Sequence, residues 1–253
     1  MTRADAQPLR YVLSAGRTGT VFLQRLLSEH LDGVTALHEP AGTRYQMVLA
    51  NFRNDWGIGG RALKWLFERA RDRRVEAATG VYVEINPFLC AMTDLLPKPG
   101  RGLRIVHMVR DPATWAVSIA TFKASTRFRH VIDYIPFAKP YPVPRPEGWR
   151  GLGEYERSLW RWNWCNERIS QLRPVADAYA LVRYENLFAR EPEARIAALE
   201  TIGTTLDLPG RLAEVRDDMA DRANPSAGEG PTIDRPTAKR ICGQLARDYG
   251  YDY

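Results

Sequence analysis

Short apolar runs alternate with segments of helical spacing along this chain. The runs that predict buried strands lie at 11–14, 34–37, 81–85, 105–109 and 179–182. After the first run, the spacing of apolar residues predicts an amphipathic helix through Phe22, Leu23, Leu26 and Leu27. Strands that alternate with helices of this size are typical of βαβ units. The pattern therefore predicts an α/β fold with a central, mostly parallel β-sheet flanked by helices.

The same spacing predicts further helices. One has an apolar face formed by Leu63, Leu66, Phe67 and Ala70. We expect the other face of this helix to carry Arg69, Arg71, Arg73 and Arg74. Other helices are expected after residue 110, over 155–172 and at the C-terminal end.

Two irregular segments interrupt the pattern. Five prolines between 136 and 146 exclude a regular helix or a central strand there, and residues 222–235 form a second long loop. Long loops in a compact domain are often binding loops or lids, although plain linkers have the same composition. With 253 residues and no internal repeat, we expect one domain over 1–253, with 1–9 as a flexible tail.

Composition narrows the cellular context. A formal net charge of +6 favours an anionic partner, such as a nucleotide, a nucleic acid or a membrane surface, over a neutral one; plain solvated charge is the alternative. Cys90, Cys165 and Cys242 are far apart in sequence, which indicates reduced thiols. No signal peptide or membrane-spanning run is visible, so we expect a cytoplasmic protein. The histidines lack metal-binding spacing, so no metal is expected.

The first candidate binding motif is the segment 14–20, Ser-Ala-Gly-Arg-Thr-Gly-Thr, between the first strand and the first helix. A tight glycine turn exposes backbone N–H groups and a helix start adds partial positive charge, so an anion binds favourably. Arg17 can donate two hydrogen bonds to an oxyanion, and Thr18 and Thr20 can donate one each. A plain strand–helix turn is the alternative. The nucleotide-triphosphatase pattern GxxxxGK[ST] is absent.

The second candidate motif runs from Arg110 to Ser118 and follows the strand at 105–109. Because the two residues are separated by roughly two helical turns, Ser118 can face the same side as Arg110. The guanidinium and the hydroxyl could then share one phosphate. The alternative is an Arg110–Asp111 pair beside a serine on an ordinary helix surface.

Together these motifs resemble those of the sulfotransferases that use 3′-phosphoadenosine 5′-phosphosulfate (PAPS) and release 3′-phosphoadenosine 5′-phosphate (PAP). Residues 17–23 resemble the 5′-phosphosulfate loop, and 105–122 resemble the 3′-phosphate motif with its Arg-to-Ser spacing. Residues 182–187 and 249–251 are similar to the strand end and the C-terminus that follow in this family. An arginine at position 17 is closer to the carbohydrate- and protein-modifying branches than to many cytosolic members. The resemblance implies a P-loop-like sulfotransferase fold.

The resemblance also implies roles for individual residues. The 5′-phosphosulfate would contact Arg17, Thr18, Gly19, Thr20 and Val21. The 3′-phosphate would be held by Arg110 and Ser118. Tyr184 would lie near the adenine, and Arg235 would bring a further basic group to the 3′-phosphate.

A base must take the proton of the acceptor, and His38-Glu39-Pro40 supplies two candidates. These residues follow the second predicted strand, and the carboxyl ends of parallel strands face the crevice where ligands bind. Related branches have a glutamate base at a comparable place, so we favour Glu39 and keep His38 as the rival. The alternative is that Glu39 only pairs with a nearby arginine.

Some features depart from the family pattern. Many cytosolic members have a catalytic histidine before a proline on the third strand, and other branches have a lysine there; the stretch 83–87 has neither. Glu84 and Asn86 are therefore candidates for contacts to the acceptor or the donor. The second positive charge that a lysine would supply in this stretch is missing. His107 is interpreted as a satisfied core histidine, and Trp160, Trp162 and Trp164 as packing residues or acceptor contacts.

The sequence thus predicts an enzyme that transfers a sulfuryl group from PAPS to a hydroxyl or amine of a small-molecule or glycan acceptor. Glu39, Arg17 and His38 are the catalytic candidates. The alternatives are a non-catalytic binder of a nucleotide or sulfated ligand and a P-loop kinase. Nucleic-acid binding is not expected, because the basic helix lacks interleaved aromatic residues. The oligomeric state and the acceptor are not predicted.

Overall fold

A five-stranded parallel sheet forms the centre of the molecule. The computed structural model describes residues 7–121, 139–212 and 231–253. In spatial order the strands are β2 (Val34–His38), β3 (Val81–Ile85), β1 (Leu9–Ser14), β4 (Leu103–Val109) and β5 (Ala178–Arg183). Each neighbouring pair is parallel. The α/β fold predicted from the hydrophobic pattern is confirmed, and all five strands lie where apolar runs predict them.

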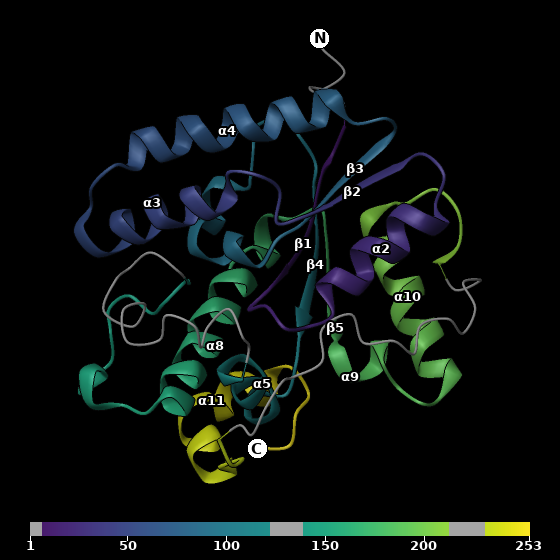
Figure 1. Cartoon of the computed structure of the whole chain (residues 1–253). Coiled ribbons are helices and arrows are strands. Elements are labelled where there is room, and N and C mark those ends of the chain that lie inside the picture. Colours follow the sequence, from purple (N-terminus) through teal and green to yellow (C-terminus); the bar gives the residue numbers. More distant parts are fainter. Residues whose placement is uncertain (1–6, 122–138, 213–230) are drawn as a thin grey trace.

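Helices cover both faces of the sheet (Figure 1). One face is covered by α3 (Thr43–Trp56), α4 (Gly60–Ala77), α5 (Pro112–Ala120), α8 (Glu154–Ser170) and α11 (Arg235–Asp248), together with the 3₁₀ segment η1 (Pro87–Leu95). The other face is covered by α2 (Thr20–His30), α9 (Tyr184–Leu187) and α10 (Pro192–Leu206). Short 3₁₀ turns lie at η2 (Trp149–Gly151) and η3 (Arg173–Val175).

The alternation of side chains along β1 divides the core in two. Tyr11 and Leu13 point into the cluster formed with α3, α4, α5, α8 and α11, whereas Val12 points into the cluster formed with α2 and α10. Both clusters are buried, so β1 carries apolar side chains on both faces, as is typical of a central parallel strand. The strand therefore holds its carboxyl end rigidly, and the loop that follows it starts from a fixed position.

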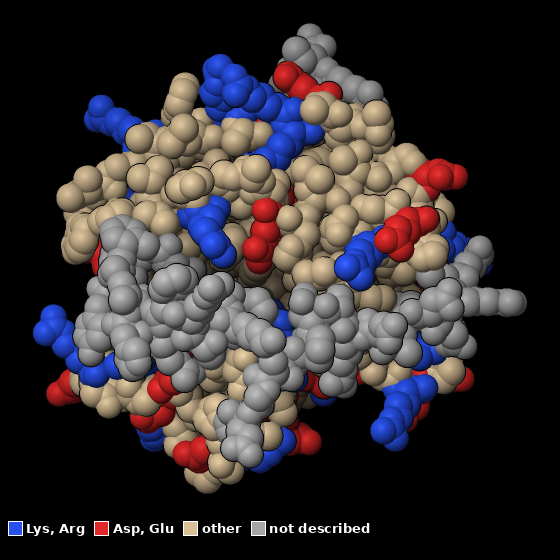
Figure 2. Space-filling model, viewed as in Figure 1, with Lys and Arg blue, Asp and Glu red and all other residues tan. Residues whose placement is uncertain are grey.

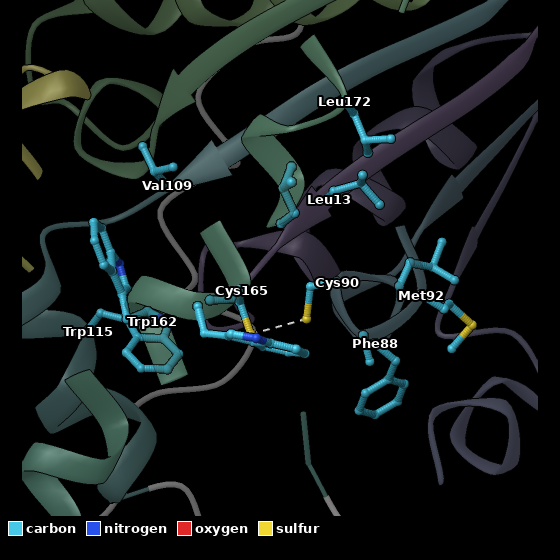
Figure 3. Packing of buried hydrophobic residues seen from close by; sticks show 14 of the residues in the cluster. Leu13, Phe88, Cys90, Met92, Val109, Trp115, Trp162, Cys165 and Leu172 are labelled. Atoms are coloured by element: carbon cyan, nitrogen blue, oxygen red, sulfur yellow. Dashed lines mark hydrogen bonds between the residues drawn. The ribbon is translucent and has the colours of Figure 1, made fainter. Parts of the chain in front are cut away.

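The larger cluster brings two cysteines together. Cys90 and Cys165 face each other in the interior (Figure 3), with 3.2 Å between the two sulfur atoms. All three cysteines of the chain are buried and free. His107 is fully buried between the Tyr179 hydroxyl, 2.7 Å from Nδ1, and the Asn166 side-chain oxygen, 2.9 Å from Nε2. Burial lowers the pKa of His107 to about 4. The interpretation as a satisfied core histidine is confirmed.

The basic face expected on α4 is corrected by the structure. Lys and Arg do gather over α4 at the top of the molecular surface (Figure 2), but Arg71 is buried against Phe67 and donates to the Leu95 carbonyl. Arg74 points inward and donates to the carboxylate of Glu84, which is fully buried. A buried carboxylate is costly unless a positive charge pairs with it. The side chain of Arg74 therefore points toward Glu84 in the core and not toward solvent.

Other expectations are corrected or fall outside the described residues. Leu9 is buried and belongs to β1, so the flexible tail expected over 1–9 is wrong at this residue. Neither α3 nor α10 was predicted, because buried polar or small residues of α3 and the Gly203 of α10 weaken the apolar pattern. Residues 136–138 and 222–230 of the two predicted loops lie outside the described residues.

Candidate functional site

The candidate motifs meet at the carboxyl edge of the sheet. The loop after β1 carries Arg17, the tip after β4 carries Arg110, and β2 is followed directly by Glu39. The strand order reverses direction around β1, since β2 and β3 lie on one side of it and β4 and β5 on the other. Ligands of open α/β sheets bind outside the carboxyl ends of the strands at such a switch point. The topology therefore gathers the predicted site residues at the expected place.

The loop after β1 has a conformation that few sequences adopt. Gly16, Arg17 and Gly19 all have positive φ angles, at 89°, 55° and 79°. A β-carbon at Gly19 would lie 2.5 Å from the ring of Phe188, so glycine is required there by both backbone and space. The indole of Trp115 donates a 2.6 Å hydrogen bond to the Gly16 carbonyl and holds the loop against α5. A non-glycine residue in this region, such as Arg17, is strained, and such strain is found at functional sites.

Arg17, Arg110 and Ser118 lie together. Arg17 Nε donates to Ser118 Oγ at 3.3 Å, and Arg110 Nη1 donates to the Arg17 carbonyl at 3.4 Å. Burial and then the neighbouring charge of Arg110 lower the pKa of Arg17. Two guanidinium groups this close repel each other, so an anion placed between them would be stabilised. The loop at 14–20 and the motif at 110–118 are thus brought into one positively charged site.

The helix start beside this pair is also suited to an anion. Gly19 is the N-cap of α2 and supplies no side chain to the first N–H groups, which belong to Thr20 and Val21. Thr18 is almost fully buried, and its Oγ1 has no hydrogen-bond partner among the described residues. A buried hydroxyl without a partner costs stability, and an oxyanion bound at this helix start would give the Thr18 hydroxyl an acceptor.

Tyr184 lies beside Arg110 on the other side of the site. The Arg110 guanidinium stands over the Tyr184 ring at 4.6 Å from its centroid, and the same ring packs on Phe188 at 4.6 Å. The cation–π contact orients the guanidinium. The structure therefore places the Tyr184 ring next to Arg110, and its expected position near the adenine stays a prediction.

The C-terminal residues hold the tip that carries Arg110. The Tyr253 hydroxyl donates to Asp111 Oδ2 at 2.7 Å, and the Tyr251 hydroxyl donates to Glu185 Oε2 at 2.8 Å. Glu185 Oε1 in turn accepts from the Asp111 backbone N–H. Arg235 lies with its Nη1 3.8 Å from Asp111 Oδ2 and is mostly exposed. The last helix and the C-terminus therefore contact the tip after β4. Arg235 reaches this tip at Asp111, the residue that follows Arg110 in sequence.

Glu39 and His38 occupy the edge beside the loop after β1. The Glu39 backbone N–H donates to the Ile85 carbonyl at 3.1 Å, and its φ of 43° turns the chain sharply after β2. His38 Nε2 lies 3.0 Å from Thr20 Oγ1 and 4.0 Å from Glu39 Oε1. Burial raises the pKa of Glu39, although the charges of Arg44 and Arg161 oppose this, and burial lowers the pKa of His38. A carboxylate with a raised pKa is better suited to accept a proton near neutral pH.

Glu84 and Asn86 have an internal role that differs from the acceptor or donor contact expected from sequence. Both are fully buried. Asn86 Nδ2 donates to Glu84 Oε1 at 2.9 Å, and Tyr82 and Arg74 both donate to Glu84 Oε2. Asn86 Oδ1 accepts from the Phe88 backbone N–H and starts η1. Their polar atoms are engaged inside the protein, and the two residues shape the turn after β3.

Sequence reasoning assigned no role to Trp115 or Arg161, and it interpreted Trp162 only as a packing residue or acceptor contact. Trp162 donates from its indole to the Arg110 carbonyl at 2.9 Å, as Trp115 does to Gly16. Arg161 is nearly buried and stands over the Trp115 ring at 5.7 Å. Only the unusual Trp-Arg-Trp sequence at 160–162 could have drawn attention to this helix.

The described residues contain neither a cluster of metal-binding side chains nor a helix that could span a membrane. Within residues 7–121, 139–212 and 231–253, no three His, Cys, Asp or Glu side chains are grouped closely enough to hold a metal ion. Among the same residues, no helix combines the length and the apolar character needed to cross a bilayer.

Comparison with solved structures identifies the fold. One similar structure is the sulfotransferase domain of the olefin synthase from Synechococcus PCC 7002, with a TM-score of 0.52 and 19% identity over 98% of this chain and 96% of that one. This chain has the sulfotransferase fold. A sulfotransferase from Mycobacterium avium is similar as well, with a TM-score of 0.52 and 13% identity over 97% of this chain and 78% of that one. No family model and no curated protein sequence matches the chain.

The sulfotransferase fold confirms the fold class expected from the motifs. At 19% and 13% identity, the likeness shows the fold and not the reaction. The activity of this chain must therefore be argued from its own site.

Proposed function

We propose that this protein is a sulfotransferase that uses PAPS and transfers its sulfuryl group to a hydroxyl or amine of a small-molecule or glycan acceptor. The observation that carries the proposal is the cluster of Arg17, Arg110 and Ser118 at the carboxyl edge of a sulfotransferase-type sheet. Two arginines from different strands converge there on a strained glycine loop and on a helix start. Such an arrangement suits a ligand with two separate anionic groups.

The residues of the site fit PAPS or PAP. In this proposal Arg17, Thr18, Gly19, Thr20 and Val21 hold the 5′ group, and the buried Thr18 hydroxyl gains the partner that it lacks among the described residues. Arg110 and Ser118 hold the 3′-phosphate, with Arg235 as an additional cation. The Tyr184 ring, packed beside Arg110, offers a face for the adenine.

Glu39 is proposed to take the acceptor proton. As the new bond forms between sulfur and the acceptor oxygen or nitrogen, the bond from sulfur to the bridging oxygen breaks, and PAP leaves with that electron pair. Arg17 and the backbone N–H groups of the α2 start stabilise the charge that develops on PAP. We prefer Glu39 to His38 because the His38 Nε2 is engaged by Thr20, whereas a third of the Glu39 side chain is exposed.

Binding and transfer measured on three proteins test this proposal. PAP affinity is measured by calorimetry for wild type, Arg17→Ala and Glu39→Ala, and radiolabelled PAPS is then incubated with a small-molecule extract. We expect Arg17→Ala to weaken PAP binding at least tenfold, because a charge-assisted contact is worth about 1.5–3 kcal/mol. Glu39→Ala should keep the wild-type PAP affinity and lose label transfer.

Each other outcome selects a different function. Equal PAP affinity in wild type and Arg17→Ala would refute the assignment of the loop after β1. Tight PAP binding without transfer to any compound would favour a non-catalytic binder on the same fold. Binding of ATP with Mg²⁺ in preference to PAP would favour a kinase, although the loop lacks the lysine that such enzymes use.

A further inference from the structure

Two arginines near Glu39 have no acidic partner among the described residues. Arg161 of α8 is only 9% exposed, and its Nε is buried without a hydrogen-bond partner. Arg44, at the start of α3, is exposed. Within the described parts of the chain, no carboxylate oxygen lies within 4.0 Å of either guanidinium. Arg161 contacts the Trp115 ring and the side chain of Cys165. Removing a guanidinium from water without a carboxylate partner is costly, so an anionic ligand would stabilise Arg161.

Aromatic contacts place both arginines at the rim of the same edge of the sheet. Arg161 stands over Trp115, and the Trp115 indole binds the Gly16 carbonyl of the loop after β1. Arg44 stands over the ring of Phe88 at 5.9 Å from its centroid. Pro87, the neighbour of Phe88, approaches the same Gly16, with its Cβ 3.7 Å from where a β-carbon of Gly16 would lie. Each arginine therefore packs on an aromatic ring. Trp115 itself contacts Gly16 of the loop after β1, and the neighbour of Phe88 lies close to the same glycine.

Glu39 lies on the same rim. The Glu39 backbone N–H donates a hydrogen bond to the carbonyl of Ile85, the last residue of β3. Asn86 and Pro87 follow Ile85 directly in sequence. Both arginines act electrostatically on the Glu39 carboxylate, yet neither makes an ion pair with it. The two positive charges exceed the single negative charge of ionised Glu39 by one. The rim beside the base is thus left positive after the nucleotide contacts of Arg17 and Arg110 have been assigned.

We infer that Arg161 and Arg44 form an anion site for the acceptor, so that the acceptor carries a carboxylate or a phosphate besides the group that is sulfated. The inference rests on the proposed function, because it takes Glu39 as the base next to which the acceptor lies. A planar guanidinium binds both anions in a bidentate manner, so the shared chemistry is a small oxyanion. The site would select acidic acceptors over neutral analogues of the same shape.

Binding of matched probes tests the inference without knowledge of the acceptor. Benzoate, inorganic phosphate and the neutral analogue benzamide are titrated into the protein by ligand-observed NMR, with and without saturating PAP. We expect benzoate and phosphate to bind and benzamide to bind at least tenfold more weakly. Arg161→Met and Arg44→Met should each reduce the affinity for benzoate at least tenfold. Arg73→Met, which removes an exposed arginine of α4, should leave it unchanged.

Two further variants make the outcome specific. Glu39→Gln should raise the affinity for benzoate, because the competing negative charge is removed while the arginines stay. Arg161→Lys keeps the buried charge and should bind benzoate better than Arg161→Met. Since Arg44 is exposed, Arg44→Met should fold normally and remain informative if Arg161→Met does not fold.

The inference is overturned if benzoate and benzamide bind alike to wild type, if neither anion binds, or if both methionine variants bind benzoate as wild type does. It is also overturned if Arg161→Met weakens PAP itself tenfold, because Arg161 would then belong to the donor site. Failure of the proposed function appears separately, as a lack of PAP binding by wild type. The loss of benzoate affinity in Arg161→Met and Arg44→Met still reports on the anion site in that case, because binding of anions by Arg17 and Arg110 is left unchanged in these variants.

Discussion

At the scale of single residues, the site depends on side chains and backbones held in unfavourable states. Arg17 and Glu39 are two of the three non-glycine residues with a positive φ within the described residues. Thr18 has a buried hydroxyl without a partner there, and Arg161 has a buried nitrogen of the same kind. These four residues cost stability and lie around the proposed donor and acceptor, as expected for a site organised before its ligands bind.

The first residue-scale prediction concerns the titration of Glu39. Burial should place its pKa above the ordinary value of 4.5, so the base form, and with it the transfer rate, is lost as the pH falls through this raised pKa. Arg44→Met should raise the pKa further, because a positive charge that favours the ionised form is removed. NMR titration of isotope-labelled glutamate side chains measures both values, and Arg73→Met serves as the control. A pKa of Glu39 below 4.5 would contradict its assignment as a base.

The second residue-scale prediction concerns Gly19. Gly19→Ala and Gly57→Ala both place a β-carbon on a residue with positive φ, and each should cost about 1–2 kcal/mol of folding stability. Only at Gly19 does the new atom also collide with Phe188, whereas nothing lies within 4 Å at Gly57. PAP affinity should therefore fall several-fold in Gly19→Ala and stay unchanged in Gly57→Ala. Calorimetric titration measures the PAP affinity of both variants. Equal PAP affinities in Gly19→Ala and Gly57→Ala would show that the loop after β1 does not hold the nucleotide.

At the scale of elements, the sequence predicts what is local and misses what is long-range. The five strands, the loop at 14–20 and the tip at 110–118 follow from apolar runs, glycines and spacing within a few residues. The inward turn of Arg74 depends on Glu84, which lies on another element, and no periodicity along α4 reveals it. The same holds for Arg161 and for the contact of Tyr253 with Asp111, because each joins parts of the chain that are distant in sequence.

The buried Arg74–Glu84 pair gives an element-scale prediction. Arg74→Met leaves the carboxylate of Glu84 without its charged partner and should destabilise the fold by about 3–5 kcal/mol. The double variant Arg74→Met with Glu84→Gln should recover part of this loss. The neighbouring Arg73→Met should change stability by less than about 0.5 kcal/mol, because Arg73 is exposed. Urea unfolding measures the three values, and similar losses in Arg73→Met and Arg74→Met would exclude the proposed role of the pair.

At the scale of the whole molecule, one parallel sheet positions both the proposed donor-binding residues and the proposed base. The donor residues follow β1 and β4, whereas Glu39 follows β2 on the other side of the switch point. The last helix and the C-terminal tyrosines connect to the donor half, through Asp111 and Glu185. A single domain over 1–253 and a cytoplasmic location stay predictions. The sulfotransferase fold, in contrast, is established by the structural comparison.

The most direct test is whether the protein binds a nucleotide more tightly when that nucleotide carries a 3′-phosphate. Calorimetry compares PAP with adenosine 5′-phosphate, which differs only by that group, on wild type and on Arg110→Ala. We predict that wild type prefers PAP at least tenfold, about 1.4 kcal/mol, and that Arg110→Ala loses most of this preference. Equal affinity of wild type for the two nucleotides, or a preference that survives in Arg110→Ala, would contradict the account.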